Sequence, residues 1–270
     1  MPVDTLGRRS RFKRTPFGKR IVLGDRDIEI LQHLYRYRYL RQSHLVALLR
    51  PKSSKRFVER LGDLFHETGL INRPPAQWHH YDARCTPLIH EITKSGIELL
   101  YRKDAIPLRV TTLSRRSHKR RTVQFEHTMM IVDALLETEL ETNAIEGQRF
   151  VPVDEIINRA PERTQTQSNP LRVPVTIRPN RDYPMVRHAI ETHIIPDALY
   201  GIEYLIEGEQ RYRFFALECE RTSPYWRSDP CYSSTARKHL AYKTYIDERG
   251  FKRDWGIPNL KLRIVRPPLP

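Results

Sequence analysis

Cysteine is scarce in this chain, and long apolar runs are missing. The three cysteines, Cys85, Cys219 and Cys231, are an odd number and form no C-x-x-C pair. This pattern argues against a disulfide framework or a cysteine zinc site and predicts a protein of the reducing cytoplasm. No apolar run reaches the roughly 18 residues that a membrane-spanning helix requires, and the basic N-terminus lacks the apolar segment of a secretory signal. We therefore expect no membrane partner.

Positive charge, by contrast, is in clear excess. The 270 residues include 47 Lys and Arg against 32 Asp and Glu, a formal charge of +15. An excess of this size predicts a polyanionic partner, and nucleic acid is favoured because no membrane segment is expected. Residues 1–22 mix basic residues with Pro and Gly. They predict a basic, loosely ordered arm, which is either a solvated tail or a segment that contacts phosphates.

Residues 23–103 have the pattern of a compact helical unit. Apolar spacing predicts helices in LGDRDIEILQHLYRYRYL, RQSHLVALLR and SSKRFVERLGDLFHETGLI, with Asp25 capping the first and Ser53 or Ser54 capping the third. Gly69 is a natural helix end. Two short strands, LINR and LIHEIT, follow, and then a further helix begins. This order is that of a winged helix-turn-helix domain.

The third of these helices would read DNA, because the N-terminal residues of the second helix of a helix-turn-helix approach base edges. Further basic residues lie in the expected wing and in a basic linker, residues 104–122. The predicted DNA contacts are Lys52, Lys55, Arg56 and Arg60 on the helix, Arg84 in the wing, and Arg115, Arg116, Lys119, Arg120 and Arg121 in the linker. The alternative for the helical unit is a protein-interaction domain, and the alternative for the linker is a plain solvated hinge.

Residues 123–270 are expected to form an α/β domain. The pattern predicts a long helix in VQFEHTMMIVDALLETEL, strands in GQRFVPVDEII, IIPDALYGIEYLIE and RYRFFALECER, a helix in YSSTARKHLAYKTYIDER and a last strand in LKLRIVR. The stretch RAPERTQTQSNPLRVPVTIRPNRDYP is expected to be an inserted loop, and EGEQ a hairpin turn. The expected order is therefore helix, three strands, helix, strand.

Three carboxylates stand out on the strand-like runs. Asp197 follows a proline, and Glu218 and Glu220 flank Cys219. With the αβββαβ order, they resemble the PD-(D/E)xK motif of the restriction-endonuclease-like nucleases. Alternation along a strand sends Glu218 and Glu220 to one face, and Asp197 meets them there if the hairpin pairs in normal register. A hard divalent cation, Mg²⁺ or alternatively Mn²⁺, would then bind all three carboxylates.

Glu220 departs from the superfamily pattern, which usually has a lysine there. Lys238 or Lys243 on the following helix is a candidate replacement, unless the two contact backbone phosphates instead. The predicted catalytic set is therefore Asp197, Glu218, Glu220 and Lys238. In this set Asp197 and Glu218 hold the metal, and Glu220 completes its coordination or orients water.

Over residues 24–266 the chain resembles the replication-relaxation family. DRDIEILQHLYRYRYL, ITKSGIELL, FEHTMMIVD and IIPDALY…FALECER carry the resemblance. The family includes C-class plasmid mobilisation relaxases, whose Asp…Glu-x-Glu set is matched by Asp197, Glu218 and Glu220. The resemblance implies metal-dependent nicking of DNA at a plasmid or related mobile-element origin or palindromic site, with accessory mobilisation or replication proteins as further partners. The alternatives are a non-catalytic DNA-binding replication or transcription regulator with a degenerate nuclease fold, and a protein-interaction module.

Overall fold

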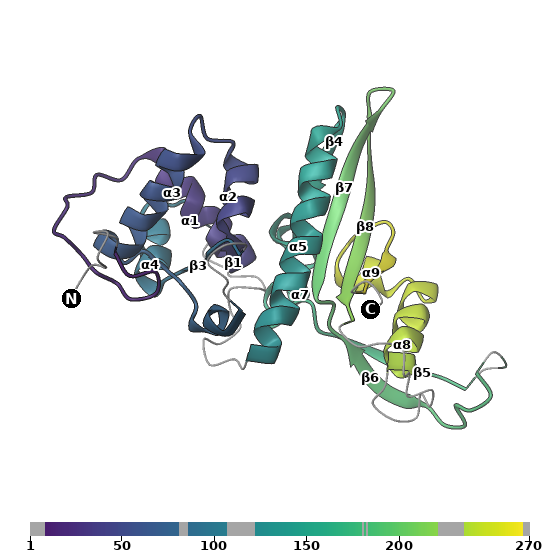
Figure 1. Cartoon of the computed structure of the whole chain (residues 1–270). Coiled ribbons are helices and arrows are strands. Elements are labelled where there is room, and N and C mark those ends of the chain that lie inside the picture. The colour runs from purple at the N-terminus through teal and green to yellow at the C-terminus, as the bar shows by residue number, and fades with distance from the viewer. Residues whose placement is uncertain are drawn as a thin grey trace. The chain divides into compact units, whose positions relative to one another are not determined.

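The structure is a computed structural model of the chain. It describes residues 9–80, 86–106, 122–179, 181, 183–220 and 235–266. The chain is mixed α/β and divides into two compact units, Met1–Val132 and Asp133–Pro270 (Figure 1). In the described part of the chain, no helix combines the length and the apolar character that crossing a membrane requires.

The first unit combines helices with a small sheet. Its elements are α1 (Asp25–Tyr37), β1 (Tyr39–Arg41), α2 (Gln42–Leu49), α3 (Ser54–Asp63), the π-helical turn η1 (Leu64–Thr68), β2 (Ile71–Asn72), the short helix η2 (Pro75–His80), β3 (Ile89–Ile92) and α4 (Lys94–Arg102). β3 lies between β1 and β2 and is antiparallel to both. α5 (Thr122–Ala144) follows and crosses the division between the units.

Local contacts set the helix ends of the first unit. Gly24 caps α1 in place of the expected Asp25, and the Asp27 carboxylate accepts the Gly24 backbone N–H at 2.9 Å. Ser53 caps α3 as predicted, and Gly69, with a φ of 69°, ends the helical turn that follows. The apolar stripes of these helices form the core, in which Ile30, Leu31, Leu34, Phe57, Leu61, Leu64 and Phe65 are buried.

The Asp27 carboxylate also binds Arg60, one of the predicted DNA contacts. The Arg60 guanidinium donates to the two Asp27 oxygens at 2.9 and 2.5 Å and to the Val22 carbonyl at 2.7 Å. These contacts tie α3 to the start of α1. Arg60 therefore has a structural partner inside the unit and is not the exposed cation that the helical pattern predicts.

The N-terminal segment is more ordered than the sequence predicts. Its described part, residues 9–22, is held against the end of α3. The Arg14 guanidinium donates to the carbonyls of Phe65 and Ile71 at 2.7 and 3.0 Å, and Lys19 pairs with Asp63 at 2.6 Å. These contacts join residues that are 44 to 57 positions apart, and local periodicity carries no information about them.

A four-stranded mixed sheet is the centre of the second unit. The elements are the part of α5 from Asp133 onward, β4 (Gln148–Val151), α6 (Val153–Asn158), α7 (Glu162–Gln165), β5 (Val173–Ile177), β6 (Ile190–Ile194), β7 (Ala198–Ile206), β8 (Glu209–Cys219), α8 (Thr235–Asp247), α9 (Gly250–Asp254) and β9 (Lys261–Val265). The strand order is β4-β7-β8-β9; β4, β7 and β8 are antiparallel neighbours, and β9 is parallel to β8. Where the sequence predicts an inserted loop, β5 and β6 form a separate antiparallel ribbon.

β7 and β8 form a long hairpin whose turn fixes its register (Figure 1). Glu207 and Gly208 are the turn residues, and both have a positive φ, 53° and 81°. That backbone suits the tight turn of an antiparallel hairpin. The ladder runs from Ile206 opposite Glu209 to Ala198 opposite Leu217. A slip of one residue would reverse which side chains face the core, so the turn decides which residues meet at the far end.

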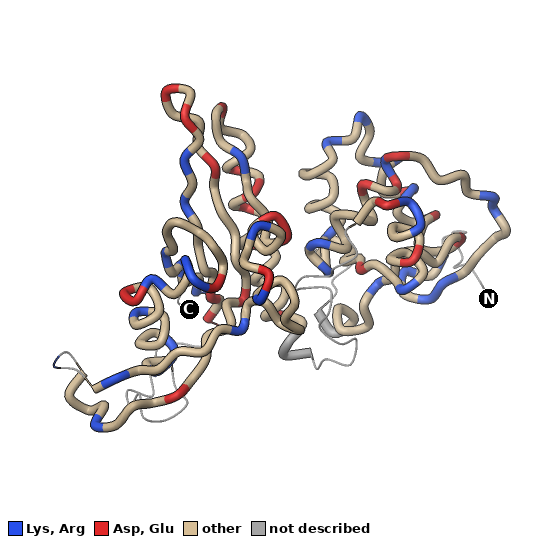
Figure 2. The backbone as a smooth tube through the Cα atoms, turned by 180° about the vertical axis from the view of Figure 1, so that it is seen from behind, with Lys and Arg blue, Asp and Glu red and all other residues tan. Residues whose placement is uncertain are grey.

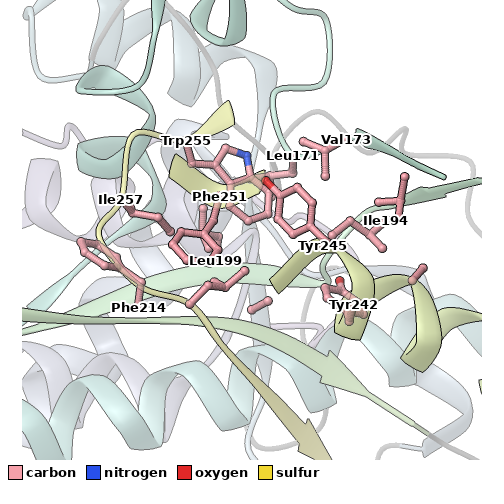
Figure 3. Close-up of a cluster of buried hydrophobic side chains, with 14 of the residues drawn as sticks. Leu171, Val173, Ile194, Leu199, Phe214, Tyr242, Tyr245, Phe251, Trp255 and Ile257 are labelled. Carbon is pink, nitrogen blue, oxygen red and sulfur yellow. The ribbon is translucent and has the colours of Figure 1, made fainter. Parts of the chain in front are cut away.

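An aromatic core holds α8 and α9 against the sheet. The indole N–H of Trp255 donates to the Pro170 carbonyl at 3.0 Å, and Trp255 packs edge-on against Tyr245 of α8, with ring centres 5.5 Å apart. Figure 3 shows these rings in one cluster with Leu171, Val173, Ile194, Leu199, Phe214, Tyr242, Phe251 and Ile257. The packing fixes α8 beside the end of β8.

Two histidines of the first unit are buried in the neutral form. His66 and His90 are 4% and 0% exposed. Burial, and next the positive charge of nearby arginines, lowers the pKa of His66 to about 4 and that of His90 to about 3. His66 Nδ1 accepts the Thr15 N–H at 3.0 Å, whereas the ring nitrogens of His90 have no hydrogen-bond partner among the described residues.

We expect the first unit to lose stability as the pH falls from about 7 to about 5. An unfolded histidine has a pKa near 6.5, so below this value the unfolded chain takes up protons that His66 and His90 do not bind in the folded state. Each of the two lowers the free energy of unfolding by about 1.4 kcal/mol per pH unit, until its folded pKa is reached. In calorimetry, His90→Leu should show a smaller fall in Tm over this range than the wild type. An equal fall in both proteins would contradict the assignment of His90.

Candidate active site

Asp197 occupies the position immediately before β7. Its backbone N–H donates to the Leu217 carbonyl at 3.0 Å, and its Oδ2 accepts the Cys219 N–H at 2.9 Å. The ladder of the hairpin ends with Ala198 opposite Leu217, so Asp197 and Glu218 are the next residues beyond this pair on the two chain segments. Backbone pairing therefore brings these two acidic residues together, as the sequence predicts for a hairpin in normal register.

Glu218, near the end of β8, is the most deeply buried acid of the site. It is 1% exposed. The hydroxyl of Tyr242 donates to its Oε1 at 2.5 Å, and the ammonium of Lys238 donates to its Oε2. Both donors come from α8, where they lie four residues apart and so share one face of the helix.

The environment of Glu218 does not favour a charged carboxylate. Burial raises its pKa to about 7; Lys238 opposes the rise, and the neighbouring charge of Asp197 adds to it. Burial and the Glu218 charge also raise the pKa of the Tyr242 hydroxyl well above its ordinary value, which keeps Tyr242 a hydrogen-bond donor. The site thus holds two interacting carboxylates and a single ammonium contact to the buried one, an arrangement that a further cation would stabilise.

Glu220 faces the same helix but has different partners. His239 Nε2 lies 2.8 Å from its Oε1, and the Arg266 guanidinium donates to its Oε2 at 2.8 Å. Burial acts to raise the pKa of Glu220, but the hydrogen bonds of Arg266 and His239 outweigh it, and the pKa lies below its ordinary value. Glu220 is therefore a stable carboxylate held by its own basic partners.

The structure does not gather the three predicted metal ligands into one cluster. Asp197 and Glu218 interact, but Glu220 is held by His239 and Arg266. Among the residues that the structure describes, no group of three or more His, Cys, Asp or Glu side chains is arranged to hold a metal ion. Glu218 and Glu220 both contact α8, which agrees with the face that strand alternation predicts for them. Alternation does not predict that His239 and Arg266 bind Glu220 and so separate it from Glu218.

The structure brings one further predicted residue into the site. Lys238 contacts Glu218, whereas Lys243, its alternative, pairs with Asp247 on the exposed side of α8 at 3.1 Å. Cys219 is buried, and burial raises the pKa of its thiol to about 12, so it is a poor nucleophile.

The predicted DNA contacts fall into three groups. Lys52, Lys55 and Arg56 are exposed near the start of α3, and Arg60 is paired with Asp27. The remaining predicted contacts lie outside the described residues: Arg84, Arg115, Arg116, Lys119, Arg120 and Arg121.

Sequence reasoning did not pair Tyr242, His239 or Arg266 with any of the three carboxylates. The spacing of Lys238 and Tyr242 is a helical i, i+4 pair, and this signal could have linked the hydroxyl to the lysine once the helix was predicted. The pairing of Arg266 with Glu220 joins residues 46 positions apart, so no local pattern reveals it.

Removing Lys238 should destabilise the fold through Glu218. Lys238→Met leaves a buried carboxylate without its cation, and we expect a loss of about 2 kcal/mol in the free energy of unfolding, since the lysine is partly exposed and the full effect of a buried pair is reduced. Urea unfolding at neutral pH measures it. Adding Glu218→Gln should recover most of the loss, and the matched control Lys243→Met should change little. If the two site substitutions act additively, the pair is not coupled as described.

Comparison with known proteins does not identify a relative of this site. A scan against models of known families finds no match, and neither a search of curated proteins nor a search of solved structures finds one.

Proposed function

We propose that this chain is a metal-dependent DNA endonuclease that nicks DNA at the origin of a plasmid or related mobile element. The observation that carries the proposal is the meeting of Asp197, Glu218 and Lys238 at one end of the β7–β8 hairpin. Two interacting carboxylates and a lysine are the parts that the PD-(D/E)xK resemblance requires.

The topology of the second unit supports this proposal. Helix α5 precedes β4, the β7–β8 hairpin follows the β5–β6 ribbon, and α8 and α9 lead into β9, which is parallel to β8. With the ribbon regarded as an insertion, the order is helix, three strands, helix, strand, which resembles that of the restriction-endonuclease-like fold. Asp197 immediately precedes β7 and Glu218 lies near the end of β8, so the hairpin places both at the same end of the strands.

Lys238 supplies a cation that the motif usually has at position 220. The superfamily usually has lysine where this chain has Glu220, and the loss of that cation is the main argument for an inactive fold. Here an ammonium from α8 reaches the Glu218 carboxylate. We propose that Lys238 stabilises the charge that develops on the attacked phosphate, while Tyr242 orients the Glu218 carboxylate.

The residues fit a divalent cation held by two carboxylates. Mg²⁺ is often bound in proteins by one or two carboxylates together with waters and substrate phosphates. A carboxylate has acceptor positions for several donors, so Glu218 keeps capacity beside Tyr242 and Lys238. Asp197 and Glu218 would hold the ion, Mg²⁺ or Mn²⁺. When bound, it would lower the pKa of a water ligand and neutralise charge on the phosphate.

The order of the first unit supports a DNA-recognition role. Its elements run helix, strand, helix, helix and then the β2–β3 pair, with β1 completing a three-stranded sheet, and this order resembles that of a winged helix-turn-helix. In this proposal α3 is the reading helix. The exposed residues Lys55 and Arg56 of its first turn, and Lys52 just before it, would contact DNA, and an origin or palindromic site would be the target.

A second candidate function is a non-catalytic DNA-binding regulator of replication or transcription. The observation that favours it is the state of Glu220, which His239 and Arg266 bind as they would a structural carboxylate. In that case the acidic pair is a remnant, and accessory mobilisation or replication proteins would do the chemistry.

A nicking assay separates the two candidates. The substrate is a supercoiled plasmid that carries the DNA flanking the gene, with Mg²⁺ or with EDTA. The endonuclease proposal predicts open-circle product only with the metal, and a loss of at least about 100-fold in rate for Asp197→Asn and Glu218→Gln. Lys252→Met, an exposed lysine of α9, is the control and should keep its rate. A wild type that binds this plasmid and leaves it closed with either metal would favour the regulator.

Binding by α3 is tested separately from nicking. Replacing Lys52, Lys55 and Arg56 together by alanine should weaken binding to duplex DNA. It should also reduce the slope of log Kd against log salt by about 0.9 for each phosphate that the variant no longer neutralises. Fluorescence anisotropy in EDTA measures both quantities.

The matched control for α3 removes the same charge from α4, where Lys94, Arg102 and Lys103 are exposed. If the two triple variants have the same affinity and the same salt slope, α3 is not the reading helix.

A further inference from the structure

The β5–β6 ribbon is an element that the proposed function does not use. It is inserted between β4 and β7 and lies outside the four-stranded sheet (Figure 1). Alternate residues of β5, Val173, Val175 and Ile177, are buried in the core of the unit, and α8 packs against both strands. One face of the ribbon is therefore fixed, and its position relative to α8 is set by packing.

The loop that joins β5 to β6 is anchored to the same core. Val186 is 2% exposed and its backbone N–H donates to the Tyr183 carbonyl at 3.0 Å. The ammonium of Lys243 lies 5.9 Å from the centre of the Tyr183 ring. Met185, the residue before Val186, is 51% exposed. The buried valine thus holds the loop so that a methionine is presented to solvent.

Three arginines flank this methionine in the sequence. Arg178, Arg181 and Arg187 are exposed, and Figure 2 shows Lys and Arg positions along this part of the ribbon. Within the described part of the chain, these three guanidinium groups have neither a hydrogen bond nor an ion pair. Other arginines of the unit are paired with carboxylates: Arg149 with Glu155 and Glu203, Arg163 with Asp254, and Arg266 with Glu220.

The ribbon is connected to the candidate active site in two ways. β6 ends at Ile194, and Asp197 follows three residues later. α8, against which β5 packs, carries Lys238. A polymer held by the loop would therefore be held by the same rigid assembly that positions Asp197 and Lys238.

We propose that the loop of the β5–β6 ribbon is a second nucleic-acid contact, at which Arg178, Arg181 and Arg187 bind backbone phosphates and Met185 makes an apolar contact with the sugar or base edges. Arginine forks match phosphate geometry. An exposed methionine among arginines is a combination that DNA-bending proteins use. The anchored loop requires little ordering on binding. The assignment rests on the proposed function only for the identity of the polyanion as DNA.

The test compares DNA binding by two triple variants of the full chain. Replacing Arg178, Arg181 and Arg187 by alanine should weaken binding to a duplex about tenfold or more near 100 mM salt and reduce the salt slope by about 0.9 for each phosphate left unbound. The control variant removes the same charge at Arg159, Lys252 and Lys261, which are exposed and lie off the ribbon. Anisotropy measured in EDTA reports binding without nicking, so the test still applies if the endonuclease proposal fails. Circular dichroism confirms that the variants fold.

A single substitution tests the apolar contact. Met185→Ser should lower the affinity about threefold or more and leave the salt slope unchanged, because the methionine side chain neutralises no phosphate. The proposal is overturned if the arginine variant and its control have the same affinity and slope. It is also overturned if the arginine variant loses binding to vesicles of anionic phospholipid but keeps its affinity for DNA.

Discussion

A carboxylate that has almost no access to water, Glu218, is the constraint on which the second unit depends. A buried charge is tolerated only where donors or a cation meet it. The chain supplies a hydroxyl and an ammonium from one face of α8, and the hairpin register adds Asp197 as a second acid opposite. The result is a site in which two neighbouring acids have one lysine between them, and this excess of negative charge is the basis on which we propose a divalent cation there.

The core of the unit is what keeps this site in place. The Glu207–Gly208 turn fixes the register of the hairpin, and the aromatic cluster around Trp255 fixes α8. The separation of Glu220 follows from the same packing, since α8 also carries His239 to the end of β8. A site built from a hairpin and a packed helix is rigid before any ligand arrives, which favours chemistry that depends on electrostatic preorganisation.

Local sequence patterns predict much of the fold but less of the candidate site. Helical periodicity predicted α1 and α3, the Ser53 cap predicted the start of α3, and the Glu-Gly turn predicted the hairpin, because these signals act over a few residues. Alternation and register predicted that Asp197 would meet Glu218. The pattern failed where a side chain finds a distant partner: Arg60 with Asp27, and Glu220 with Arg266. It also missed the β5–β6 ribbon, whose prolines and arginines are typical of a loop although its buried face alternates as a strand.

The central claim is that Asp197 and Glu218 bind one divalent cation between them. Crystals of the wild type soaked in Mn²⁺ test it most directly, because manganese gives an anomalous signal that locates the ion without reference to activity. The account predicts an anomalous peak within coordination distance of an oxygen of each carboxylate, and its loss in Glu218→Gln. A well-ordered site without such a peak, or a peak held by Glu220 and His239 alone, would contradict it.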